Sequence, residues 1–176
     1  MFTKADIEKY FISEKSASFA IVIIGVVAIV LALVFFFYLK TNWYKGVAIP
    51  FIIIGLLHVT AGYTVYKSCD EGRKKNVYAY DMNPDQLKNN ELPRMEKVRN
   101  NFKIFKALEV VSLLLGIGLF FYFRHNADNA FWAGFGVALA IEAAITFGFD
   151  FIGDNNATKY TNGLQSFIHT SVNKNQ

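Results

Sequence analysis

Four long apolar stretches divide the chain, and each is long enough to form a membrane-spanning helix. They cover residues 17–39, 43–66, about 103–123 and 129–150, and they contain few charged residues. Crossing the ~30 Å hydrocarbon core of a bilayer takes about 20 apolar residues in a helix. The pattern therefore predicts four transmembrane helices joined by shorter polar segments.

The last apolar stretch, residues 129–150, carries a second pattern. Gly134, Ala138, Glu142, Thr146 and Asp150 recur at every fourth position, which places them on one face of a helix. Lipid is a poor partner for such a small and polar face, so we expect it to face other helices or water. The remaining helices should pack around this stripe.

Helical periodicity continues outside the apolar stretches. Ile7 and Phe11 share one face of a short amphipathic helix, with Thr3 as its cap, and we expect this helix to lie on the membrane surface. From Pro93 a single helix should run to about residue 123, roughly 45 Å at 1.5 Å per residue, so its first turns should project as a stalk. The tail has a second amphipathic pattern, formed by Tyr160, Leu164, Phe167 and Ile168.

These patterns predict an all-α polytopic membrane protein, a four-transmembrane-helix bundle with cytoplasmic amphipathic helices at both termini. Gly72, a Lys/Arg run, Asn83 and Pro84 indicate a loop between the second and third spans. The predicted parts are an amphipathic interfacial helix (1–16), a transmembrane hairpin (17–66), a cytoplasmic loop (67–92), the stalk with two further spans (93–152) and a cytoplasmic amphipathic tail (153–176).

Basic residues are distributed unevenly about the predicted spans. Fifteen Lys and Arg residues flank one side, whereas Lys40, Lys45 and Arg124 flank the other. The positive-inside rule then places both termini and the long loop in the cytoplasm. The first apolar run is too long for the core of a secretory signal, so we expect it to be retained as an anchor. We expect a bacterial inner-membrane location, with the lipid bilayer as a partner.

Composition excludes several kinds of chemistry. The single cysteine, Cys69, cannot form an internal disulfide or a multi-cysteine metal site. The spans lack the Glu-x-x-His pairs of a di-iron bundle, and no nucleophile elbow, phosphate loop or dinucleotide fingerprint occurs. A site of two glutamates and one histidine remains the weakest alternative for a metal. We expect no catalytic residues, no cofactor, no metal and no nucleic-acid partner.

Three ionisable residues are predicted to lie at one depth in the membrane. His58, Glu109 and Glu142 each lie about 10–14 Å below the cytoplasmic surface, at 1.5 Å per residue. Small residues beside each of them allow close helix approach, so the polar groups should converge. Such a cluster either fixes helix register or binds a ligand or protons. The predicted polar cluster comprises His58, Glu109, Glu142, Thr60, Tyr63, Ser112, Thr146 and Asp150.

The basic segments beside the third span predict a second kind of site. Beyond setting topology, they are expected to contact a protein partner or anionic lipid head groups. The expected function is that of a non-enzymatic component of a membrane complex (a partner subunit, sensor or protective protein), and we expect a homo-oligomer. A proton- or ion-conducting channel or transporter is the first alternative, and a small membrane enzyme is the second. The predicted contact residues are Arg73, Lys74, Lys75, Arg94, Lys97 and Arg99.

Overall fold

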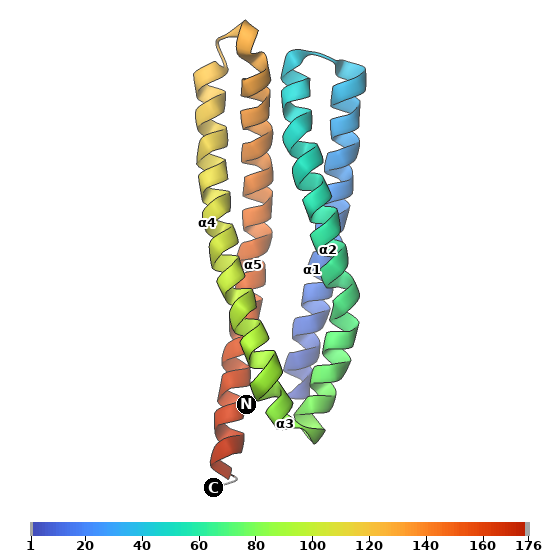
Figure 1. Cartoon of the computed structure of the whole chain (residues 1–176), viewed down its shortest axis with the longest axis vertical. Coiled ribbons are helices and arrows are strands. Elements are labelled where there is room, and N and C mark those ends of the chain that lie inside the picture. The colour runs from blue at the N-terminus through green and yellow to red at the C-terminus, as the bar shows by residue number, and fades with distance from the viewer. Residues whose placement is uncertain (1, 175–176) are drawn as a thin grey trace.

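The computed structural model describes residues 2–174, with side chains described to residue 170, and it shows four long helices without a strand in this range (Figure 1). The all-α prediction is therefore confirmed. The helices are α1 (Lys4–Val34, extended by a π-helical turn over Phe35–Leu39), α2 (Asn42–Met82), the one-turn α3 (Pro84–Gln86, followed by a π-helical turn over Leu87–Glu91), α4 (Leu92–Phe123) and, after a 3-10 turn over Ala127–Asn129, α5 (Ala130–Lys174).

Local polar residues begin the helices where the sequence pattern predicts. The Thr3 backbone N–H donates to the Asp6 carboxylate at 2.8 Å, as in a capping box at the start of α1. Lys40 adopts a left-handed φ of 59° and ends the first hairpin helix, and Thr41 Oγ1 then accepts the N–H of Tyr44. These turns are short, so α1 pairs with α2, and α4 pairs with α5.

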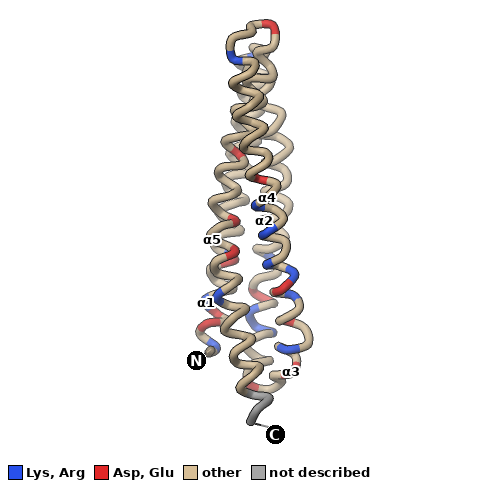
Figure 2. Tube along the Cα trace, turned by 90° about the vertical axis from the view of Figure 1, so that its left-hand side faces the viewer, with Lys and Arg blue, Asp and Glu red and all other residues tan. Residues whose placement is uncertain are grey.

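The two hairpins are joined by contacts between α2 and α5. We call residues 17–66 and 104–150 the apolar half, and residues 2–16, 67–103 and 151–174 the terminal half. In the apolar half the helices stand in the row α1–α2–α5–α4, which Figure 1 shows from the front and Figure 2 from its edge. Both termini and α3 lie at one end, and the two short links lie at the other (Figure 1).

All four helices contain a stretch long and apolar enough to cross a membrane. Large apolar side chains of these stretches face outward, such as Leu57 at 63% exposure and Leu114 at 64%. Between Met95 and the end of α4 at Phe123, Gly116 is the one buried residue among the described positions. An exposed apolar surface of this kind is what lipid would cover.

Close backbone contact holds the apolar half together. A Cβ atom built on Gly25 of α1 would lie 2.7 Å from the carbonyl oxygen of Gly55 on α2, so neither helix could carry a larger residue there unchanged. Gly116 of α4 and Gly136 of α5 form an equivalent crossing, because a Cβ on Gly116 would lie 2.6 Å from the Gly136 oxygen. These contacts confirm that small residues bring the helices together.

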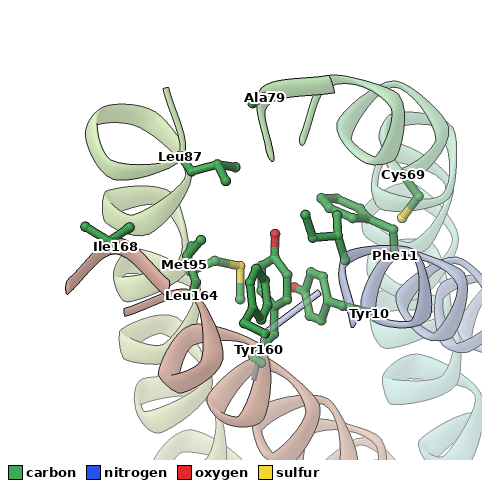
Figure 3. Packing of buried hydrophobic residues seen from close by; sticks show 12 residues of the cluster. Tyr10, Phe11, Cys69, Ala79, Leu87, Met95, Tyr160, Leu164 and Ile168 are labelled. Carbon is green, nitrogen blue, oxygen red and sulfur yellow. The ribbon is translucent and has the colours of Figure 1, made fainter. Parts of the chain in front are cut away.

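The terminal half has a different core, built from large side chains of all four long helices (Figure 3). Tyr10 of α1 stacks on Tyr160 of α5 with 4.3 Å between the ring centroids. Met95 of α4 points toward both rings, and Leu164 is fully buried beside them. This is the ordinary close-packed core of a water-soluble helix bundle.

Two of the predicted terminal segments are corrected by this core. The first 16 residues do not form a separate helix on a membrane surface, because they begin α1, and Ile7 and Phe11 are buried at 0% and 3% exposure. The predicted tail likewise continues α5, with Tyr160 and Leu164 buried, while residues 175–176 lie outside the described part. The apolar face of residues 2–16, which was expected to contact the membrane, packs against the tail instead.

The predicted loop 67–92 is also wrong over most of its length, because α2 continues to Met82. Cys69, Asn76 and Ala79 lie on the buried side of this extension, whereas Lys74 and Lys75 are exposed. Gly72, which suggested a loop, receives the Phe11 ring, since a Cβ there would lie 2.6 Å from the ring. The Lys/Arg run is thus the solvated face of a helix.

Candidate functional site

The central contact between α2 and α5 contains a buried polar group. His58 of α2 is 9% exposed and Glu142 of α5 is 2% exposed. The His58 Nε2 atom lies 3.1 Å from Thr146 Oγ1, and His58 Nδ1 lies 4.0 Å from Glu142 Oε2. Two residues of the stripe on α5 therefore meet the histidine across the helix interface, and a third, Ala138, is fully buried.

The hydrogen bonds of Thr146 favour one position for the hydrogen on His58. The Thr146 hydroxyl donates to the Glu142 carbonyl oxygen at 2.8 Å, so its oxygen accepts from His58 Nε2–H. In a neutral His58, Nδ1 then presents a lone pair to Glu142 Oε2, and neither of these two buried atoms has a hydrogen-bond partner. A proton on His58 Nδ1 or on Glu142 Oε2 would make that atom a hydrogen-bond donor and leave the other as the acceptor.

Glu109 belongs to a different polar group from His58 and Glu142. Its carboxyl group lies against that of Asp150 on α5, and beside them the Lys106 ammonium donates to Asp154 at 2.5 Å. The order of the helices, α1–α2–α5–α4, explains why Glu109 is separate from His58. The helix α4 packs along α5 and has no comparable contact with α2. The ionisable residues of three helices therefore form two successive pairings along α5 instead of one cluster.

The other residues predicted for the cluster lie outside it. Thr60 is exposed and its hydroxyl donates to the Leu56 carbonyl oxygen of its own helix at 2.6 Å. Tyr63 is 58% exposed, which directs it away from the helix interface. Ser112 is half-buried on α4. Of the predicted set, the structure brings together His58, Glu142 and Thr146 in one group and Glu109 and Asp150 in another.

The six basic residues predicted to contact a partner fall into two classes. Lys74, Lys75 and Lys97 are exposed to solvent. Arg94 instead donates through Nε and Nη2 to both oxygens of Glu91 at 2.8 Å, and its guanidinium lies over the Phe11 ring. Arg73 and Arg99 are half-buried. The lysines thus face solvent, and so does part of Arg94, whose side chain is 41% exposed while its guanidinium is held by Glu91.

Arg94 and Glu91 form a polar network that sequence reasoning missed. Glu91 is 5% exposed, and the hydroxyl groups of Tyr10 and Tyr160 lie close to this ion pair. Burial raises the pKa of the nearby Glu14 carboxyl above its ordinary value, although the charge of Arg94 opposes this shift. The three-residue spacing of Glu91 and Arg94 was the available signal, since such residues are neighbours on a helix.

Within residues 2–174 as described, no three His, Cys, Asp or Glu side chains are arranged to hold a metal ion. Comparisons of the chain with protein-family profiles, curated protein sequences and solved structures found no significant match.

Proposed function

We propose that the protein is a small integral membrane protein and a non-enzymatic component of a membrane complex. In this proposal it binds an acidic protein partner through the basic surface of α2 and α4 in the terminal half. Following the charge distribution, both termini lie in the cytoplasm of a bacterial cell, and the chain forms a homo-oligomer in the inner membrane.

The observation that carries the proposal is the charge of this surface. Between Lys67 and Lys106 there are ten Lys and Arg residues and six Asp and Glu residues. Figure 2 shows the Lys and Arg residues of α2 and α4 mostly along one side of the terminal half, while acidic residues follow α5. A surface with a net positive charge attracts a partner of opposite charge and orients it on approach.

The rigidity of the terminal half supports the same role. Its four helices share one aromatic core, so it extends the spanning helices as a packed rod. The cavities along this rod are open grooves at its surface. A rigid, charged projection suits docking better than it suits enclosing a substrate.

The test is a charge reversal of the three exposed lysines, Lys74→Glu, Lys75→Glu and Lys97→Glu, in the full chain expressed in its own membranes. The native complex containing the chain should decrease to the size of the free protein on native gels, with unchanged thermal unfolding. Lys9→Glu with Lys159→Glu is the control, because it reverses charges on α1 and α5 and should leave the complex intact. A complex that survives the triple reversal would contradict the proposal.

The buried His58–Glu142 pair favours proton transport as a second candidate function. Two facing acceptors that need one proton form a plausible relay site within a membrane. Glu142→Gln should then abolish proton flux into liposomes that contain the purified protein and a pH-sensitive dye. Absence of flux in the wild-type protein, or flux that persists in the variant, would remove this candidate.

A further inference from the structure

A groove between α1 and α2 lies where the apolar and terminal halves meet. Its volume is about 380 Å³, and both helices line it. The uncharged stretch of α1 begins at Ala17, and that of α2 ends at Tyr66, so the groove straddles the boundary between apolar and charged surface. Phe19 and Tyr66 line its apolar side, toward the uncharged stretches, and Lys15, Asp70 and Arg73 line its polar side.

The polar side of the groove has a positive charge available for a ligand. Lys15 donates to Asp70 at 2.5 Å, and its ammonium lies 4.9 Å from the centroid of the Tyr66 ring. The Arg73 guanidinium is 4.0 Å from the same carboxylate, which is the outer limit of an ion pair. One carboxylate thus faces two cations, and Arg73 retains N–H donors in the fork geometry that matches phosphate oxygens.

The apolar side continues from the groove onto the exposed surface of α1. Phe19 is 53% exposed with its ring packed against Tyr66, at 5.8 Å between centroids. Ile23, one turn further into the apolar stretch, is 48% exposed. A ligand with its phosphate at Arg73 would therefore meet apolar surface in the direction of the membrane core. Tyr66 occupies the depth at which aromatic residues gather in membrane proteins.

We propose that this groove binds an anionic phospholipid. The phosphate and anionic head group contact Arg73 and Lys15, and an acyl chain lies along Phe19 and Ile23. The proposal rests on the membrane placement proposed above and is independent of the protein partner. A soluble phosphate compound would use the same donors but would gain nothing from the exposed apolar wall.

The test uses the full-length protein purified in detergent, with bound lipid counted by native mass spectrometry. Phosphatidylglycerol should be retained in preference to phosphatidylcholine at equal concentration. Arg73→Gln should reduce this retention about fivefold, which corresponds to about 1 kcal/mol for one basic residue at an anionic surface. Lys159→Gln removes the same charge at an exposed residue of α5 outside the groove lining, and should leave retention unchanged.

A second variant tests the groove in the opposite direction. Asp70→Asn removes the one carboxylate among the lining residues and should increase phosphatidylglycerol retention by a similar factor. Equal retention of the two lipids, or equal losses in Arg73→Gln and Lys159→Gln, would overturn the proposal. Displacement of the lipid by glycerol phosphate at equal concentration would also overturn it. Because no other protein is present, these results are independent of the partner experiment.

Discussion

The two halves of the molecule are held together by different means. In the terminal half, large side chains such as Tyr10, Met95 and Tyr160 fill a common core between all four long helices. In the apolar half, the helices meet in pairs at glycines such as Gly25 and Gly116, and most large side chains point outward. The same four helices thus pass from a closed bundle into an open row.

This difference follows from the surroundings expected for each half. Water drives large apolar side chains into a core, and in the terminal half Tyr10, Met95 and Leu164 are buried in this way. Lipid provides no such force, because leucine is as well accommodated by acyl chains as by protein. Helices then associate through close backbone approach and polar pairs such as His58 and Glu142. The main hydrophobic core therefore lies in the terminal half, outside the predicted membrane.

The largest expected effect comes from truncating a leucine in the terminal core. Leu164→Ala should lower the free energy of unfolding by about 2–5 kcal/mol, because Leu164 is fully buried and its loss leaves a cavity. Leu114→Ala makes the same change at 64% exposure in the apolar half and should have little effect. Circular dichroism during denaturation in detergent measures both. Equal losses at the two positions would contradict the contrast between the halves.

A smaller effect is expected from adding a methyl group at a helix crossing. Gly116→Ala should cost about 1–3 kcal/mol, because the new Cβ would press against the Gly136 carbonyl oxygen and force α4 and α5 apart. Gly118→Ala, two residues along the same helix, meets nothing within 4 Å. It should be neutral or stabilising by up to about 1 kcal/mol, since alanine favours helix. A neutral Gly116→Ala in the same denaturation assay would refute the role of the crossing.

The smallest effect concerns the pH dependence of the terminal half. Burial raises the folded-state pKa of Glu14, so folding opposes its ionisation. Wild-type stability should therefore increase as pH falls from neutral through this raised pKa toward the ordinary value of 4.5, and Glu14→Gln should lose this part of the slope. Melting temperatures measured between pH 5 and pH 8 provide the comparison.

Glu8→Gln is the control for this pH experiment, since Glu8 is exposed on the same helix. It should retain the wild-type slope. If melting temperature depended on pH equally in the wild type and in Glu14→Gln, burial in the terminal core would not affect ionisation of the Glu14 carboxyl.

Much of the candidate site could be predicted because helical periodicity is local. The four-residue spacing of Ala138, Glu142 and Thr146 identified the face of α5 that meets α2. The position of Glu109 could not be predicted in this way. Its neighbours depend on the order of the helices in the row, and any order would satisfy the same spacing.

The terminal half was harder to read for a related reason. Arg94 resembled a solvent-facing residue of a basic segment, but it packs over Phe11 and pairs with a buried glutamate. Gly72 resembled a loop residue, although its missing side chain makes room for the same phenylalanine ring. Both roles depend on Phe11 of α1, which is more than 60 residues away in sequence.

The sequence by itself determined the four helices, their pairing into hairpins, the common end for both termini and the inward face of α5. These features depend on apolar length, residue periodicity and turn residues, all of which act between near neighbours. The tertiary structure decided that the helices form a row, that His58 meets Glu142 without Glu109, and that the terminal segments form the main core. Those outcomes depend on which helix faces pack together, and that choice is made between residues distant in the chain.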